Sequence, residues 1–304
     1  MNLCGIQLEP AGAPIRVPVK EGYAFRKETA DFSAELFIDL INRRLKAGAC
    51  QYGDSAAFGA YLERIAAANG LTKILLTVRE EQWQPLFLLG FELEAINPFF
   101  FQGQPGFHLS KFLDPERRIS RRLEAEDEIL NQARHAPRSE PKPLPPDYRI
   151  ATAGPDQTAE LAGLFASVFA TYPTPLNDPS YLTPRIAEGA GYRIISHGQT
   201  IVSAATLEID AATGGAELTD CATLPEYQGQ GLMSFLIQAL EEDAGRLGVQ
   251  TVYTIARAIS PGINKAFARL GYAYGGRFVN NCDICGQFED MNLWSKRIER
   301  SGPL

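Results

Sequence analysis

Apolar residues follow two periods along this chain and predict a mixed α/β protein. Helical spacing covers 54–68, with Asp54 as N-cap and Asn69-Gly70 as the stop, and 80–89, which ends at Gly90. The short apolar run Leu71–Val78 predicts a buried strand between these helices.

The first 133 residues give a further set of expectations. Apolar positions from Phe32 to Ile41 predict another helix, and three prolines make residues 1 to about 30 irregular. Phe91–Ile96 alternates like a strand, and a hairpin then leads to Phe107–Phe112. The charged segment 114–133 predicts an amphipathic, solvated connecting helix.

A proline-rich segment divides the chain. Residues 137–146 read PRSEPKPLPP and cannot form a packed element, so they predict an extended, semi-rigid linker. We therefore expect an N-terminal α/β domain over 1–133, a linker over 134–147 and a second domain over 148–304.

The second domain has a regular alternation of strands and helices. Strands are expected at 148–153, 192–197, 200–209, 217–224, 250–256, 272–279 and 289–295, and helices at 155–170, from 232 to before Gly248, and at 261–270.

A glycine-bearing turn joins the central strand of this domain to its longest helix. Pro225 ends the strand, Gln228-Gly229-Gln230-Gly231 follows, and a helix with apolar residues on one face begins at Leu232. Such a turn offers unpaired backbone N–H groups and the positive end of a helix dipole to an anion. On its own, this feature is explained better by an ordinary tight turn than by phosphate binding.

The longer string Gln228–Met233 resembles the pyrophosphate loop of the GNAT acetyltransferases, (Q/R)-x-x-G-x-(G/A), with Met233 in place of Gly or Ala. The β-α-β-β-β-α-β-α-β-β order also matches the GNAT fold, a mixed central sheet flanked by helices. The resemblance implies acetyl-CoA as co-substrate and no metal. The cofactor-binding residues that it implies are Cys221, Ala222, Thr223, Leu224, Gln228, Gly229, Gln230, Gly231, Leu232, Met233, Asn264 and Phe267.

Acetyl transfer to an amine needs a base, and the departing thiolate benefits from an acid. Glu217 and Asp220 on the central strand are candidates for the base, although three-residue spacing puts them on opposite faces unless a bulge intervenes. The resemblance favours Glu217. Phe267 stands where many GNAT enzymes have their tyrosine acid, so Tyr253 or Tyr272 could serve instead, or the thiolate could leave unassisted.

Several longer strings narrow the resemblance to the β-lysine N-acetyltransferases. They are Thr219–Tyr227, Tyr253–Ala258, Leu270–Gly276, Asn280–Gly286 and the loop Tyr172–Asp178. This resemblance covers most of 148–296 and implies acetylation of the side-chain amine of β-lysine, which yields a compatible solute used in osmoadaptation. The substrate-binding residues expected on this basis are Tyr172, Asp178, Arg257 and Asn280, with Arg257 as partner of the substrate carboxylate. Another amine substrate, or a non-catalytic CoA sensor, are the alternatives.

Composition adds limits to this hypothesis. A net charge of −7 disfavours nucleic-acid binding, and no apolar run reaches the length of a membrane span. An odd number of cysteines at irregular spacings is typical of a reducing cytoplasm, and no signal peptide is expected at the start. A homodimer is compatible with all of this.

A weak internal repeat links the two domains. Leu71–Val78, a helix and Leu88–Phe91 parallel Thr251–Ala256, a helix and Arg269–Tyr272. Either the first domain is a degenerate half-GNAT, or the likeness arises by chance. Its counterpart of the phosphate turn, Gln51–Asp54, lacks a second glycine and carries a carboxylate, so we expect no CoA binding there.

Overall fold

The computed structural model describes residues 3–9, 12–19, 22–138, 142–189, 191–211 and 213–298. The elements of the N-terminal half are β1 (Leu3–Ile6), β2 (Ile15–Pro18), β3 (Tyr23–Glu28), β4 (Phe32–Asp39), β5 (Arg44–Tyr52), α1 (Ser55–Ala68), β6 (Lys73–Val78), α2 (Glu80–Leu88), β7 (Glu92–Phe101), β8 (Gln104–Phe112), a 3-10 turn at Pro115–Arg118 and α3 (Leu123–Arg134).

The C-terminal half follows the linker. Its elements are β9 (Tyr148–Thr152), a 3-10 turn at Pro155–Gln157, α4 (Thr158–Val168), α5 (Pro179–Ala187), β10 (Gly191–His197), β11 (Thr200–Asp210), β12 (Gly215–Thr223), a 3-10 turn at Pro225–Tyr227, α6 (Leu232–Arg246), β13 (Thr251–Arg257), α7 (Pro261–Arg269), β14 (Ala273–Ile284) and β15 (Gln287–Arg297).

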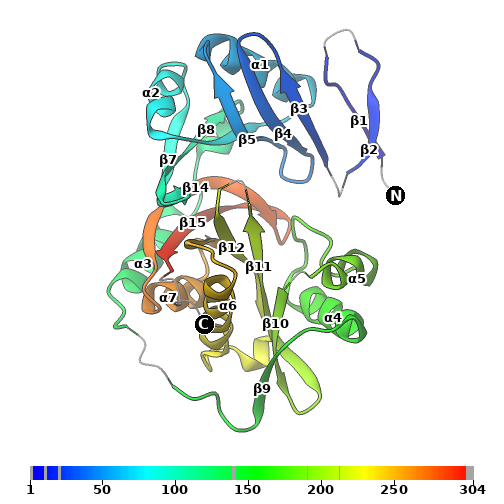
Figure 1. Ribbon diagram of the computed structural model, residues 1–304, viewed down its shortest axis with the longest axis vertical. Helices are drawn as coiled ribbons and strands as arrows, with labels where there is room; N and C mark the ends of the chain where they lie inside the picture. Colours follow the sequence, from blue (N-terminus) through cyan, green and yellow to red (C-terminus); the bar gives the residue numbers. More distant parts are fainter. Residues whose placement is uncertain are drawn as a thin grey trace.

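Strands from both halves join one sheet. Within the described residues its order is β3-β4-β5-β6-β8-β7-β14-β15-β13-β12-β11-β10-β9, so the halves meet at β7 and β14 (Figure 1). Counted outward from this junction, β7-β8-β6-β5-β4-β3 of the N-terminal half corresponds to β14-β15-β13-β12-β11-β10 of the C-terminal half. The parallel pair β5–β6 corresponds to β12–β13, and the antiparallel pair β6–β8 corresponds to β13–β15. Among its described residues, the N-terminal half has no counterparts of β9, α4 and α5.

Bulges repeat at matching positions of the two halves. The β4–β5 ladder shifts register between Ala34 and Leu36, and the β11–β12 ladder shifts between Ala204 and Thr206. The hairpins β7–β8 and β14–β15 each carry two shifts, again at corresponding places. Since a bulge re-aims the side chains around it, the two halves share their local geometry as well as their strand order.

Close packing at the junction depends on two glycines of β14. The pairing of β14 with β7 is through Gly276 and Ala95. A Cβ at Gly276 would lie 2.3 Å from the carbonyl oxygen of Glu94, and one at Gly275 would lie 2.5 Å from that of Ile96. No larger residue fits either position without moving the backbone.

Two predictions for the N-terminal half are wrong. Residues 32–41 form β4 rather than a helix, because the alternation Phe32, Ala34, Leu36 and Ile38 has the period of a strand and buries one face. Residues 1 to about 30 contain β1, β2 and β3 among the described positions, rather than irregular chain. The predicted helices α1 and α2 and the strand β6 are present.

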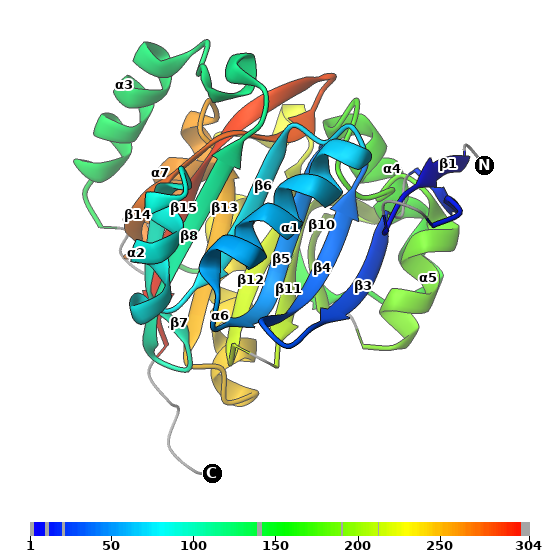
Figure 2. The same ribbon diagram turned by 90° about the horizontal axis from the view of Figure 1, so that it is seen from above.

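The N-terminal sheet buries one face under α1 and α2, and its other face turns toward the C-terminal half. Figure 2 shows α1 lying over β4, β5 and β6, with strands of the C-terminal half behind them. The core under α1 includes Phe58, Leu62 and Ile74, each at most 1% exposed. In the C-terminal half, α6 and α7 cover one face of the sheet, and α4 with α5 covers part of the other.

Connections between the halves agree only partly with expectation. The predicted helix over 114–133 is a 3-10 turn followed by α3, and α3 packs against α7 with Glu126 and Ala133 buried, so it is not simply solvated. Part of the expected linker, residues 139–141, lies outside the described residues.

In the C-terminal half, α5 was not predicted. No helix in the described ranges is long and apolar enough to cross a bilayer.

A buried polar network fixes the two halves against each other. The ammonium of Lys73, fully buried, lies 2.8 Å from the Glu94 carboxylate and donates to the carbonyl of Val279 at 2.9 Å. Glu94 in turn accepts from the Val279 N–H at 2.7 Å and from the Ser110 hydroxyl. These contacts satisfy backbone groups that the β14 bulge removes from the sheet ladder.

The next residues of the bulge are held in the same way. Arg44 donates to the carbonyl of Asn281 at 3.0 Å, and the Asn42 side chain accepts from the Asp283 N–H at 2.7 Å. Arg117 donates to the carbonyl of Asn280 at 2.8 Å. Every one of these donors or acceptors comes from the N-terminal half, so the network sets the relative position of the two sheets.

We predict that Lys73→Met lowers the free energy of unfolding by about 3–5 kcal/mol, because it leaves the Glu94 carboxylate buried without a cation. Urea unfolding of the single and double variants measures this. Lys73→Met combined with Glu94→Gln should be less destabilised than the sum of the two single variants. Simple additivity would show that the pair is not coupled.

Candidate active site

A wedge-shaped opening lies between the two central strands of the C-terminal half. Strands β12 and β13 pair in parallel from Gly215 with Thr251 to Glu217 with Tyr253, and the pairing ends there. Beyond this point β12 still pairs with β11 on its other side, as far as Thr223 with Ser203. One edge of residues 218–223 is therefore open and can hydrogen-bond an extended, amide-containing chain.

The turn Gln228–Gly231 lies at the end of this opening and leads into α6. Gly229 and Gly231 have φ of 77° and 78°, values that favour glycine. Within the described chain, no acceptor meets the backbone N–H groups of Gly229, Gln230 and Gly231. Met233 packs its side chain against the core and leaves the turn clear. The turn therefore presents N–H groups and a helix N-terminus to an anion, as a pyrophosphate requires.

The turn before α1 in the N-terminal half, which corresponds to Gln228–Gly231, differs because it contains a carboxylate. The carboxylate of Asp54 accepts from the N–H groups of Ala56 and Ala57 at 2.9 and 3.0 Å and caps α1. An internal carboxylate thus occupies the place that a phosphate would take, and a second negative charge would be repelled there.

A bulge brings the two candidate bases to one side of the sheet. Asp220 has φ of 53° and lies where the β11–β12 register shifts. This adds one residue to β12, so Glu217 and Asp220 both line one pocket of about 1260 Å³ instead of facing opposite sides. The sequence left this outcome open.

Glu217 and Asp220 differ in their surroundings. Glu217 has no hydrogen bond or contact ion pair in the part of the chain that the structure describes, and burial together with the charge of Glu208 raises its pKa to about 7. Burial also raises the pKa of Asp220 to about 6, but this carboxylate accepts from the Tyr192 hydroxyl at 2.8 Å. Glu217 is therefore the less constrained proton acceptor near neutral pH.

Tyrosines complete this wall of the pocket. Tyr172 and Tyr253 both line it, and burial raises the pKa of each phenol well above its usual value, which keeps both protonated. Tyr272 is not among the lining residues: it is 4% exposed and packs edge-on against Phe267, with ring centroids 4.8 Å apart. Tyr253 is thus the candidate acid that the geometry retains.

Two residues expected to contact CoA are committed elsewhere. Asn264, fully buried, donates to the carbonyls of Arg257 and Ser260 at 2.8 and 2.7 Å, and its own oxygen accepts from Asn292 and Trp294. With its amide saturated, Asn264 shapes the start of α7 rather than meeting a ligand. Phe267 is also fully buried in the core.

The substrate residue Arg257 requires a correction. Its guanidinium makes two contacts with the Glu289 carboxylate, at 2.5 and 2.8 Å, and Glu289 is 4% exposed. The pair occupies Nε and one Nη of the guanidinium, and Arg257 is not among the residues that line the pocket.

Asn280 and Asp178 also lie outside the large pocket. Asn280 donates to the carbonyls of Arg117 and Ile119, at 3.0 and 2.9 Å, on the other side of β14. Asp178 caps α5 and accepts from the N–H and hydroxyl of Ser180. Of the four expected substrate residues, Tyr172 alone lines the pocket.

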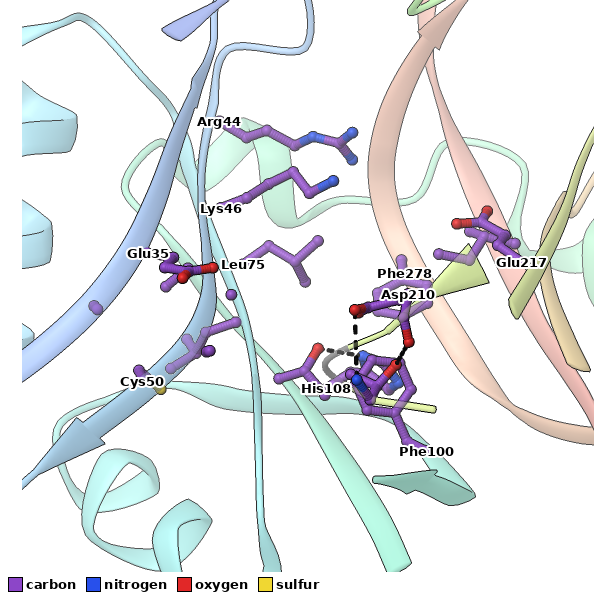
Figure 3. A pocket seen from close by; sticks show the side chains of 18 of the residues that line it. Glu35, Arg44, Lys46, Cys50, Leu75, Phe100, His108, Asp210, Glu217 and Phe278 are labelled. Atoms are coloured by element: carbon purple, nitrogen blue, oxygen red, sulfur yellow. Dashed lines mark hydrogen bonds between the residues drawn. The ribbon is translucent and has the colours of Figure 1, made fainter. Parts of the chain in front are cut away.

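The opposite wall of the pocket comes from the N-terminal half, which sequence reasoning did not assign to the site. Figure 3 shows Arg44 and Lys46 of β5 projecting toward the side that holds Glu217. Leu75 and His108 lie on the same wall. The alternation of polar Arg44 and Lys46 with buried Leu45 and Ala47 indicates a solvent-facing or ligand-facing side, but not which of the two.

Unsatisfied polar atoms gather in this pocket. His108 Nε2, Thr174 Oγ1 and Asn281 Oδ1 are buried without a hydrogen-bond partner, and all three residues line it. Burial lowers the pKa of His108 to about 3, so its ring is neutral. Since buried polar groups are normally satisfied, these three atoms are exceptions among the described residues.

Comparisons with known proteins agree with this geometry. Residues 161–272 match the model of the acetyltransferase (GNAT) family. N-acetyltransferase YodP of Bacillus subtilis is 33% identical over 274 residues, which is 89% of this chain and 98% of that protein. The chain belongs to the GNAT acetyltransferase family. It is an N-acetyltransferase with acetyl-CoA as its co-substrate, and the predicted fold class is confirmed.

Further relatives carry a more specific name. Beta-lysine N(6)-acetyltransferase of Methanosarcina mazei is 32% identical over 258 residues, covering 78% of this chain and 95% of that protein. The protein of the same name from Methanococcus maripaludis is 30% identical over 239 residues, covering 79% and 87%.

We predict that Gly231→Ala raises the KM for acetyl-CoA about 5- to 30-fold, because a left-handed conformation costs alanine roughly 1–2 kcal/mol and the turn must shift. Steady-state kinetics at saturating acceptor measure this. Gly53→Ala in the corresponding turn of the N-terminal half is the matched control and should leave this KM unchanged. Equal effects of the two substitutions would place the cofactor elsewhere.

Proposed function

We propose that this enzyme transfers the acetyl group of acetyl-CoA to the side-chain amine of β-lysine and forms Nε-acetyl-β-lysine. Two relatives that share most of the chain are named for this reaction. The observation that carries the proposal is a pocket that combines a free carboxylate, Glu217, with a cationic wall opposite. A substrate with ammonium groups and a carboxylate fits such a pocket.

In the proposed reaction, Glu217 removes a proton from the ammonium group that enters the opening between β12 and β13. The neutral nitrogen attacks the thioester carbonyl, a C–N bond forms and the C–S bond breaks. Tyr253, adjacent to Glu217 in the sheet register, donates its proton to the departing thiolate, and the second proton that the nitrogen loses as the amide forms restores the phenol. Asp220 accepts from the Tyr192 hydroxyl and so helps to keep the pocket in shape.

The two halves divide these tasks in our interpretation. Residues 148–304 hold acetyl-CoA through the open edge of Cys221–Leu224 and the turn Gln228–Met233. Residues 1–133 form a degenerate half-GNAT that binds no CoA, since Asp54 occupies its anion site, and 134–147 connect the two. The repeated strand order supports this view.

The charge of the product suggests a role for the proposed reaction. β-Lysine carries two ammonium groups and one carboxylate, and acetylation removes one positive charge to leave a neutral zwitterion suited to accumulation as a compatible solute. We place the reaction in the cytoplasm, in keeping with the five free cysteines among the described residues.

A second candidate is acetylation of a polyamine, favoured by the carboxylates that line the pocket, including Glu35, Glu208 and Glu217. Release of free thiol from acetyl-CoA with β-lysine, α-lysine and spermidine separates the candidates, and NMR of the product identifies the acetylated nitrogen. β-Lysine should give the highest kcat/KM, with acetylation at the terminal amine. A preference for spermidine would favour the polyamine reaction, and no turnover with any amine would favour a CoA sensor.

We predict that Glu217→Gln lowers kcat by about 100- to 10,000-fold, the range expected for loss of a general base. In the wild type, kcat/KM should rise with pH as Glu217 loses its proton near pH 7. This rise in kcat/KM should be absent from the pH profile of Glu217→Gln. An unchanged profile would exclude Glu217 as the base.

The same carboxyl makes a stability prediction with a definite sign. Because its pKa is raised in the folded state, ionisation of Glu217 destabilises the fold as pH rises from about 4.5 through about 7. Glu217→Gln should therefore raise Tm relative to wild type at about pH 8 and have little effect at about pH 5. Scanning calorimetry at both pH values measures this difference, and a Tm gain of equal size at both would contradict the assignment.

A further inference from the structure

On the N-terminal wall of the pocket, Lys46 is a cation that is free to bind a ligand. Arg44 is fully engaged: it meets Asp39 at 2.8 Å, the carbonyl of Asn281 at 3.0 Å and the Cys282 thiol at 3.6 Å. Lys46, two residues further along β5, lines the same pocket but has no hydrogen bond or contact ion pair in the described part of the chain.

We propose that Lys46 binds the carboxylate of the acceptor and thereby directs the amine at the other end of the molecule toward Glu217. This rests on the proposed function and names the substrate class of that site: an aminocarboxylate whose reacting amine lies far from its carboxylate. The N-terminal half then takes part in recognition, although it binds no cofactor.

The sheet geometry places Lys46 for this task. Leu45 and Ala47 are buried against the N-terminal core, so Lys46 between them must point to the pocket. Arg44 on the same face is anchored by Asp39 and by the β14 bulge, which fixes the direction of β5. Figure 3 shows Lys46 and Glu217 on opposite sides of the pocket.

The charge balance of this wall favours an anion. Arg44 is neutralised by Asp39, whereas the carboxylate that acts most strongly on Lys46 is Glu217 on the far wall. Desolvation by the surrounding protein and the positive charge of Arg44 lower the pKa of Lys46. A carboxylate bound to the ammonium group would raise this pKa again. Lys46 is still open to water in the absence of a ligand, so an acceptor can reach it.

The test compares acceptors with and without the carboxylate. We measure kcat/KM of wild type and Lys46→Gln with β-lysine and with pentane-1,4-diamine, its decarboxylated analogue. Lys46→Gln should lower kcat/KM for β-lysine by about 10- to 100-fold, as expected for loss of a charge-assisted hydrogen bond, and leave the diamine and the KM for acetyl-CoA within about twofold. An equal loss with both acceptors, or no loss with either, would overturn the proposal.

Arg79→Gln provides the matched control. Arg79 also lines the pocket, but its guanidinium stacks over the Phe101 ring at 4.4 Å. Removing this charge should leave the preference for β-lysine over the diamine intact. If it abolished the preference as strongly as Lys46→Gln does, the general charge of the wall rather than Lys46 would be responsible, and the proposal would fail.

A second acceptor pair separates this inference from the proposed function. If wild type does not acetylate β-lysine, the same variants are assayed with 5-aminopentanoate and pentylamine. A wild-type preference for the aminocarboxylate that disappears in Lys46→Gln would support Lys46 as the carboxylate site while excluding β-lysine as substrate. Equal use of the two acceptors by wild type would overturn the inference.

Discussion

The site depends on how the buried pair of Lys73 and Glu94 is joined to the bulge of β14. A bulge frees backbone N–H and C=O groups, and burying them without partners would be costly. Lys73, Glu94, Arg44, Asn42 and Arg117, all from the N-terminal half, supply those partners. The same contacts fix the distance between the two sheets and thus the shape of the pocket.

The repeated strand order explains why the two halves can face each other and yet act differently. Both halves have the bulged strand, the helix after it and the bulged hairpin. The functional difference comes from a few residues at corresponding positions. In the C-terminal half, Gly229 and Gly231 leave their turn open to an anion, whereas in the N-terminal half Asp54 fills its turn with a carboxylate. In our proposal, the C-terminal half therefore binds the cofactor, and the N-terminal half forms one wall of the pocket.

Much of the catalytic half could be predicted from local sequence. The turn Gln228–Met233 has a short-range pattern whose chemistry depends mainly on its own backbone, and Tyr172, Glu217 and Tyr253 do line one pocket as expected. The position of Asp220 could not be derived, because period-two alternation puts it on the wrong face and a bulge leaves no clear sequence signal.

The residues that bind the acceptor substrate were harder to predict from sequence, for a physical reason. Arg257, Asn280 and Asp178 have the right chemistry, but their partners, among them Glu289 and Arg117, are distant in sequence, and only the fold shows that they are already engaged. Conversely, Lys46 lies on β5, a strand that was not predicted, in a domain to which no substrate residue was assigned, and its place opposite Glu217 arises from the junction of β7 with β14.

The most direct test of this account is a crystal structure of the enzyme with CoA and β-lysine bound. We expect the pyrophosphate on the N–H groups of Gly229–Gly231, the terminal amine of β-lysine next to Glu217 and its carboxylate against Lys46, with no CoA at Asp54. A β-lysine carboxylate bound away from β5, or a nucleotide at the N-terminal turn, would contradict the division of labour described above.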